Sequence, residues 1–193
     1  DSRLRVFDTD HPGGDLADWF PRQAQIIDLS QTSGQVRLFD TMIGEPANNH
    51  VVDLQSELLL KFFNIFHDIA FDEGARQVGL AVSVYFLLDR STSSLQAARM
   101  VRSKLRCSEY VVVLNEAIGS LLHLASVRES YARIAKDREI VLPRISPEAR
   151  AYVEAPDFSF SGFIAGEAQA LPSAVRFELW NLLETIYNQR TPV

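Results

Sequence analysis

Short apolar runs alternate with longer amphipathic stretches along most of this chain. Nearly uncharged runs rich in β-branched residues are typical of strands that are buried on both faces of a sheet. The pattern predicts five such strands and a weaker sixth. The five are 4–7, 50–53, 81–89, 109–115 and 139–143, and the weaker one is 25–29.

The stretches between the strands repeat with the period of a helix. They predict helices over 55–71, 93–105, 117–135 and 174–189, with a short helix near 147–152 inside a long connection. Ser93 or Ser94 can cap the second of these helices, and Ser173 can cap the last long one. Strands that alternate with helices of this length predict right-handed crossovers. We therefore expect a three-layer α/β fold, with a mostly parallel sheet covered by helices on both faces.

Composition is consistent with one ordinary globular domain. The 193 residues are 47% hydrophobic and 23% charged, which is enough to bury one sizeable core, so we expect a single domain over 1–193. The net charge of -6 argues against a surface built entirely for nucleic acid, although a local basic patch remains compatible with it.

Cysteine usage and hydropathy indicate where the protein works. The single cysteine, Cys107, cannot form an intramolecular disulfide, and no Cys/His cluster has the spacing of zinc ligands. The apolar runs are too short to span a bilayer. We therefore expect a cytoplasmic protein without a membrane partner.

Carboxylates follow the first two predicted strands. Asp8 and Asp10 come after the first strand, and Asp53 ends the second. The carboxyl ends of parallel strands meet at the ligand-binding edge of an α/β sheet. Because only Thr9 separates Asp8 from Asp10, an extended segment turns both carboxylates to one side, where they suit Mg²⁺ and an attacking water. The alternatives are a turn through Pro12–Gly14 that Asp10 caps, and a plain strand end at Asp53.

Two further strand ends suit a nucleotide base. Asn115 closes the fourth strand, and its side-chain amide can donate to and accept from a purine edge. Pro143 closes the fifth strand, and its ring can frame a base. The alternative interpretations are local: Asn115 as a turn former and Pro143 as a strand terminator.

A basic cluster lies on or just beyond the helix predicted over 93–105. Its members are Arg99, Arg102, Lys104 and Arg106. Four positive charges so close together suit DNA phosphates. We favour a solvated helix face instead, because the neighbouring apolar positions already define the buried side of that helix.

Taken in order, these motifs resemble the ParA/MinD family of deviant-Walker P-loop ATPases, which position plasmids, chromosomes and division machinery. The resemblance covers roughly residues 4 to 145. Segment 6–10 with Pro12 and Gly13 resembles the first switch segment, and 51–54 resembles the Walker B strand. The later matches are 85–89 with 93–95 (the next strand and helix), 112–115 (the strand whose Asn contacts adenine) and 140–143 (the last strand, with its base-lining proline).

The resemblance implies a role for each candidate residue. Asp10 would place the attacking water, Asp8 and Asp53 would serve the magnesium shell, and Asn115 and Pro143 would hold the base. ATP or ADP and Mg²⁺ would be the cofactors. Family members dimerise around two ATP molecules and hydrolyse them slowly. The implied function is a homodimerising ATPase of plasmid or chromosome partition, plasmid stability or division-site positioning, with a protein partner from such a system and nonspecific DNA as a candidate partner.

The chain departs from the family pattern at three places. His11 is inserted between Asp10 and Pro12, and Gln55 stands where the family commonly has a proline. The 193 residues also contain no Gly-rich phosphate loop with its lysine, which in the family follows a strand in the middle of the sheet. Without that loop nucleotide binding should be very weak.

Three functional hypotheses remain open. We expect these residues to be the larger, C-terminal part of a longer natural chain that carries the loop. The first alternative is a catalytically inactive pseudo-ATPase that serves as an interaction module. The second is another P-loop enzyme, such as a small-molecule kinase or a dethiobiotin-synthetase-like ligase.

Overall fold

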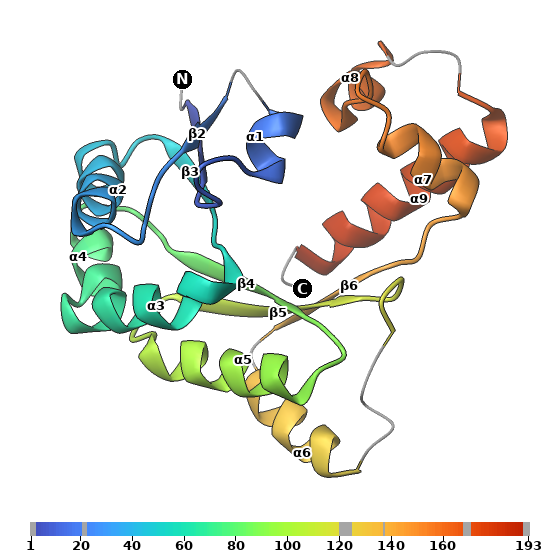
Figure 1. Cartoon of the computed structure of the whole chain (residues 1–193). Helices are drawn as coiled ribbons and strands as arrows, with labels where there is room; N and C mark the ends of the chain where they lie inside the picture. The colour runs from blue at the N-terminus through green and yellow to red at the C-terminus, as the bar shows by residue number, and fades with distance from the viewer. Residues whose placement is uncertain (1–2, 21–22, 120–124, 137, 168–170, 191–193) are drawn as a thin grey trace. The chain divides into compact units, whose positions relative to one another are not determined.

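The computed structural model has an α/β fold and describes residues 3–20, 23–119, 125–136, 138–167 and 171–190 (Figure 1). The first sheet contains β1 (Leu4–Asp8), β2 (Ala24–Ile26) and β3 (Asn49–Asp53) in the order β2-β1-β3. Both strand pairs are parallel, and the register sets Asp8 opposite Asp53. The carboxyl ends of β1 and β3 therefore lie side by side.

Helices and an aromatic core accompany this sheet. The elements are α1 (Asp15–Trp19), α2 (Thr32–Gly44), the 3₁₀ helix η1 (Ser56–Leu58), α3 (Leu59–Asp68) and α4 (Phe71–Gln77). The ring centroid of Phe39 in α2 is 5.3 Å from that of Phe62 and 4.7 Å from that of Phe71. All three rings are buried, and burial of one such side chain contributes roughly 1.5–3 kcal/mol. This contact set holds α2, α3 and α4 together.

The helix predicted over 55–71 is wrong at both ends. Its first turn is the 3₁₀ helix η1, and α3 ends at Asp68. Ala70 then adopts a left-handed conformation with φ of 52°, which side chains rarely adopt and which stops the helix before α4 starts. The chain turns there, so that Phe66 and Phe71 both enter the core.

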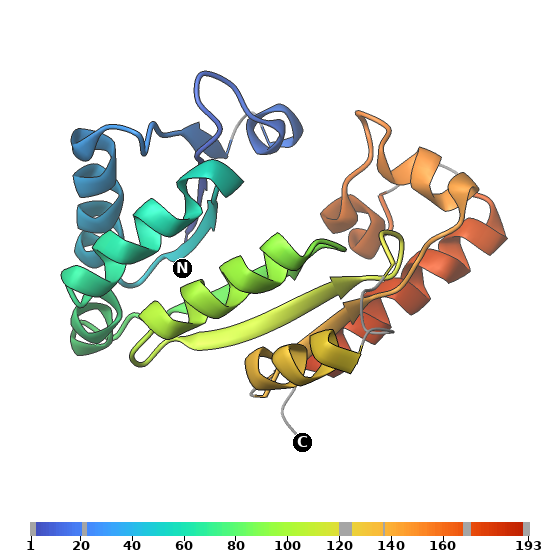
Figure 2. The same cartoon turned by 60° about the horizontal axis from the view of Figure 1, so that its bottom comes forward.

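The second sheet contains β4 (Ser83–Leu88), β5 (Glu109–Asn115) and β6 (Glu139–Leu142) in the order β4-β5-β6. β5 and β6 are parallel, with Asn115 opposite Leu142 (Figure 2). All six predicted strands exist, within a few residues of their predicted ends. They form two three-stranded sheets, however, where the sequence predicted one. β3 and β4 are terminal strands, and none of the described strands pairs with both.

The remaining helices are α5 (Thr92–Lys104), α6 (Ala125–Ile134), α7 (Pro147–Val153), α8 (Phe160–Ala165) and α9 (Ser173–Arg190). They confirm the predicted helices at 93–105, 147–152 and 174–189, and α6 confirms the later part of 117–135; residues 120–124 lie outside the described residues.

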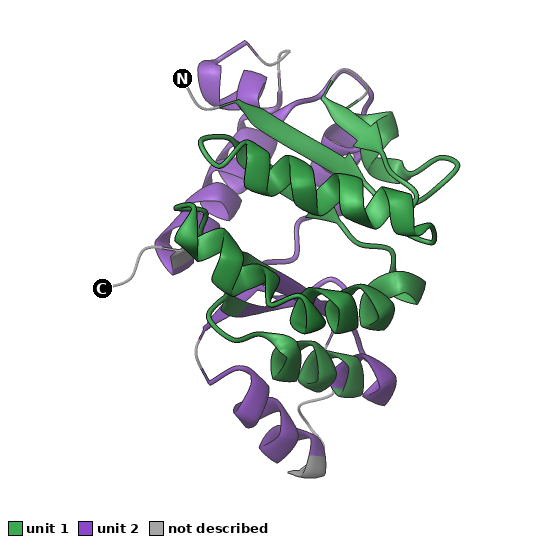
Figure 3. Cartoon of the chain, turned by 90° about the vertical axis from the view of Figure 1, so that its left-hand side faces the viewer, with its two compact units in different colours: residues 1–84, 96–110 green, residues 85–95, 111–193 purple. Residues whose placement is uncertain are grey.

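The chain forms two compact units, residues 1–84 with 96–110 and residues 85–95 with 111–193 (Figure 3).

Asp72 of α4 fixes the connection between α5 and β5 within the first unit. Its Oδ2 accepts backbone N–H bonds from Arg106, Cys107 and Ser108 at 2.8, 2.9 and 3.2 Å, and the Ser108 hydroxyl also donates to it. Burial works to raise the pKa of Asp72, but these hydrogen bonds lower it overall. A buried carboxylate is tolerated here because four hydrogen bonds reach its Oδ2 atom, although Oδ1 has no partner among the described residues.

In the second unit, α9 lies along β6 and protects that strand's backbone (Figure 2). The side-chain amide of Gln189 accepts from the Val141 N–H at 2.6 Å and donates to the Val141 carbonyl at 3.0 Å. One side chain thereby replaces two hydrogen bonds of a neighbouring strand. Covering an edge in this way prevents pairing with other chains.

We expect Gln189→Ala to destabilise the protein by about 1 kcal/mol, because the Val141 backbone groups lose both partners. The neighbouring Asn188→Ala is the matched control, since Asn188 is exposed on the same helix. Urea unfolding of both variants measures the difference. Equal stability of the two variants would show that the Gln189 contact contributes nothing.

Candidate functional site

Asp8, at the end of β1, is a buried carboxylate that organises the following loop. Its side chain is only 1% exposed. Oδ1 accepts from the Asp10 N–H at 3.0 Å, and Oδ2 accepts from the Ala17 N–H in α1 at 2.8 Å. Two backbone donors therefore compensate its burial and hold both ends of the segment 10–17.

Gly14 allows this arrangement because it lies against the Asp8 carboxylate. A Cβ atom added at Gly14 would stand 2.3 Å from both carboxylate oxygens, whereas one added at Gly13 would meet nothing within 4 Å. The carboxylate cannot easily move aside, because both of its oxygens are hydrogen-bonded. The chain bends over residues 10–12. Position 14 requires glycine because a larger side chain would clash with the Asp8 carboxylate.

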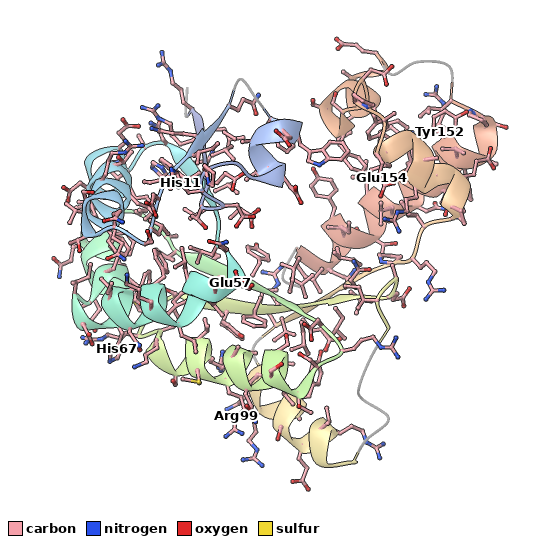
Figure 4. All side chains as sticks on the ribbon, in the orientation of Figure 1. His11, Glu57, His67, Arg99, Tyr152 and Glu154 are labelled. Carbon is pink, nitrogen blue, oxygen red and sulfur yellow. The ribbon has the colours of Figure 1, made fainter. Side chains whose placement is uncertain are left out.

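Asp10 and Asp53 carry uncompensated negative charge near Asp8. Burial, followed by repulsion from Asp8, Asp15 and Glu57, raises the pKa of Asp10. Burial, followed by repulsion from Asp8, Asp10 and Asp15, raises the pKa of Asp53. No ion pair of the described residues involves Asp8, Asp10 or Asp53. We call Asp8, Asp10 and Asp53 the carboxylate cluster. Two nearby residues of the chain are labelled in Figure 4: Glu57 on η1 and His11 on the loop after β1.

Asp10 contributes an unsatisfied carboxylate oxygen to the carboxylate cluster. The Oδ1 atom of Asp10 is buried and has no hydrogen-bond partner among the described residues, so a cation would satisfy it. Asp8 has both oxygens occupied by backbone donors. Within the described part of the chain, no group of three or more such side chains could by itself hold a metal ion. Two carboxylates nevertheless suffice for Mg²⁺, which usually keeps water and phosphate ligands.

Asn115 and Pro143 lie at neighbouring strand ends in the second unit. Asn115 is opposite Leu142, the residue before Pro143. The Asn115 Oδ1 accepts from the Ala117 N–H at 2.9 Å, which is the local turn that the sequence offered as an alternative. Two bonds between Glu116 and Arg144 join the same two strand ends. The structure thus brings this pair together; its contact with a base stays a prediction.

The basic cluster is largely engaged by its own unit. The guanidinium carbon of Arg102 lies 5.4 Å from the centroid of the Tyr110 ring. Arg106 forms an ion pair with Glu73 at 3.1 Å and also donates to the His67 carbonyl. Lys104 is half-buried, and Arg99 is exposed (Figure 4). The predicted solvated helix face is therefore only partly correct, because Arg102 and Arg106 contact other residues of their own unit. Contact of this cluster with DNA stays a prediction.

A shallow hollow of about 720 Å³ lies along α2, lined by residues such as Val36, Arg37 and Asp40. It contains none of the predicted site residues. None of the helices in the described ranges is both long and apolar enough to cross a membrane.

Sequence reasoning missed the roles of Thr9 and Gly14. Thr9 is fully buried, and its hydroxyl accepts from the Gln55 N–H at 2.8 Å. A threonine between two carboxylates, and a glycine six residues after the first of them, are visible in the sequence. Only the fold shows that Thr9 bonds to Gln55 and that Gly14 lies against the Asp8 carboxylate.

Comparison with family models, curated proteins and solved structures finds no match for this chain. The functional proposal therefore rests on the order of the motifs and on the geometry of the described residues.

We expect Gly14→Ala to destabilise the protein by about 1–3 kcal/mol, since the new methyl group would displace the buried Asp8 carboxylate. Gly13→Ala should change stability by only about 0.5 kcal/mol, because space is open there. Thermal unfolding of the two variants tests this. Comparable losses in both would contradict the close approach at Gly14.

Replacing Asp53 with Asn should stabilise the protein at pH 7 by about 0.3–0.5 kcal/mol, because it removes the repulsion between Asp53 and its neighbouring carboxylates. The effect is small because Asp53 is half-exposed and solvent screens its charge. The pKa of Asp53 is raised in the folded state, so the folded wild type binds this proton more tightly than the unfolded chain does. As pH falls through the raised pKa toward 3.8, wild-type Asp53 is neutralised and the advantage of the variant disappears.

Denaturant unfolding of wild type and Asp53→Asn between pH 7 and pH 3 measures this difference. Asp40→Asn, an exposed carboxylate on α2, is the control. A pH-independent difference, or a variant less stable than wild type at pH 7, would contradict the repulsion at Asp53.

Proposed function

We propose that this protein is a ParA/MinD-like ATPase that switches between a monomer and an ATP-bound dimer in DNA partition, plasmid stability or division-site positioning. The observation that supports it most strongly is the carboxylate cluster. Asp8 and Asp53 lie opposite each other at the carboxyl ends of adjacent parallel strands. Asp10 follows Asp8 by two residues, in the loop after β1. These are the ends of the segments that resemble the first switch and Walker B strands.

The proposal assigns different tasks to the three carboxylates. Asp8 shapes the switch loop through its bonds to Asp10 and Ala17. Asp53 and Asp10 offer the negative charge that would hold a hydrated Mg²⁺. The ion, when bound, would neutralise phosphate charge, which is the main requirement of phosphoryl transfer. By the resemblance, Asp10 is also the residue that we assign to orienting an attacking water.

A complete site also needs a phosphate-binding loop. By the resemblance this loop follows a strand in the middle of a three-layer P-loop fold. Two edges of the described sheets are compatible with an additional neighbour: β3 ends one sheet and β4 ends the other. Val51 of β3 and Leu87 of β4 are 48% and 69% exposed, although apolar residues in the middle strands of parallel sheets are normally covered. We expect a strand that carries the loop to pair at one of these edges.

One observation favours the second candidate, a pseudo-ATPase interaction module. Both oxygens of Asp8 are held by backbone donors, as expected of a structural carboxylate. Such a protein would keep the fold and bind a protein partner without nucleotide turnover.

The natural full-length protein should form a dimer in the presence of Mg²⁺ and a slowly hydrolysed ATP analogue, and should remain a monomer with ADP. Asp10→Asn should retain the dimer while ATP hydrolysis falls about 100-fold or more, because water loses its orienting group. Asp18→Asn on α1, an exposed carboxylate, is the matched control. Light scattering coupled to size exclusion, with a phosphate-release assay, measures both effects.

Absence of an ATP-dependent dimer of the full-length protein would overturn the ATPase proposal. Retained partner binding without any nucleotide affinity would instead support the pseudo-ATPase. Product formation from a small molecule, abolished by Asp10→Asn, would identify another P-loop enzyme.

A further inference from the structure

Helix α9 is held firmly within the second unit along one of its faces, where it lies against α7 and β6 (Figure 1). Val175 and Leu179 are buried in a core that also contains Phe163 of α8. The carboxylate of Glu178 accepts two hydrogen bonds from Ser146, one from its backbone N–H and one from its hydroxyl. Together with the bonds to β6 described above, these contacts fix the orientation of the opposite face of α9.

That opposite face carries two exposed aromatic side chains. Phe177 is 69% exposed and Trp180 is 43% exposed. They are three positions apart in the helix, so they lie on the same side of it. The ring centroid of Trp180 is 5.0 Å from that of the buried Phe163, and this contact holds the indole in place. Aromatic side chains that are already held in place lose little conformational entropy on binding, and they are enriched in protein interfaces.

Opposite charges stand on either side of the aromatic pair along the helix. Arg176 is four residues before Trp180, and the exposed Glu184 is four residues after it. No ion pair among the described residues includes Arg176 or Glu184. Both charges are therefore available to a binding partner. We call Arg176, Phe177, Trp180 and Glu184 the α9 patch.

The α9 patch is complementary to a second copy of itself. If two α9 helices pack antiparallel about a two-fold axis at Trp180, each position lies level with the position equally far beyond Trp180 in the other copy. Arg176 and Glu184 are each about 6 Å from Trp180 along the helix, so they would meet across the axis twice. The aromatic rings of both copies would gather between these two pairs. A parallel pair of helices would instead set Arg176 level with Arg176, and like charges repel.

We propose that the α9 patch is part of the homodimer interface, where it binds the α9 patch of the second copy in antiparallel orientation. This inference rests on the proposed function, because the dimer concerned is the ATP-bound dimer. One pair of helices covers less than the roughly 800 Å² that each partner buries in a standard interface. The α9 patch therefore strengthens the dimer but does not hold two copies together alone, in keeping with a monomer in the presence of ADP.

The test is the dissociation constant of the full-length dimer with Mg²⁺ and a slowly hydrolysed ATP analogue, measured by analytical ultracentrifugation. Arg176→Glu and Glu184→Arg each replace two attractive pairs with two repulsive ones, and each should weaken the dimer by about 10-fold. The double variant restores both pairs with reversed polarity and should dimerise within about 3-fold of wild type. Arg128→Glu, on an exposed arginine of α6, is the matched control and should dimerise like wild type.

Phe177→Ala tests the aromatic part of the patch and should weaken the dimer by about 10-fold or more. Because this side chain is largely exposed, the variant should unfold at the same temperature as wild type. A wild-type dimer that none of these variants weakens, or single variants that the double variant does not rescue, would overturn the antiparallel α9 contact and leave the ATP-dependent dimer standing. A wild type that forms no dimer with the ATP analogue would overturn the proposed function, and the inference with it.

Discussion

The parallel register between β1 and β3 is the constraint on which the candidate site depends. It sets Asp8 directly opposite Asp53 and brings the two loops that follow within hydrogen-bond reach. Val6, Phe7 and Asp8 are consecutive and all buried, so both faces of β1 are covered at its carboxyl end. A slip of one residue would bring the exposed, charged Arg5 into this buried stretch, which makes it costly. The hydrophobic core thereby specifies where the carboxylates lie.

The loop after β1 combines compensated and uncompensated charge. Asp8 is buried but satisfied by two backbone donors, and Thr9 is buried but bonded to the neighbouring strand end. Burial, followed by repulsion from nearby carboxylates, instead raises the pKa of both Asp10 and Asp53. Hydrogen bonds hold this loop in place although its carboxylates repel one another. Stability alone would not favour that arrangement. Such departures concentrate at functional sites.

The sequence predicted the strands well because their signal is local. Runs such as 109–115 are apolar, short and bounded by polar residues, and they appear within a few residues of the expected limits. Helix α2 was not predicted, although Gln35, Leu38, Phe39 and Met42 form a buried stripe at helical spacing. The first residue of the stripe is the polar Gln35, whose side chain donates to the Leu29 carbonyl. Hydropathy alone therefore does not predict this helix.

Longer-range features were not predictable in the same way. The contact of Asp8 with Gly14 and Ala17, and the stacking of Arg102 on Tyr110, depend on how separate elements pack. The division of the strands into two sheets depends on which strand edges find partners, and nothing in the β3 or β4 sequence records that. Motif order predicts a family resemblance, whereas only the packing shows which of these side chains have internal hydrogen-bond partners.

The most direct test of the central claim, that the ends of β1 and β3 form a divalent-cation site, is to map Mn²⁺ on the protein by paramagnetic broadening of backbone amide NMR signals. At low Mn²⁺ concentration, broadening should be confined to residues 8–17 and 53–57, and excess Mg²⁺ should reverse it. Broadening that is spread over exposed carboxylates elsewhere, or that spares the amides of Asp10 and Asp53, would contradict the account.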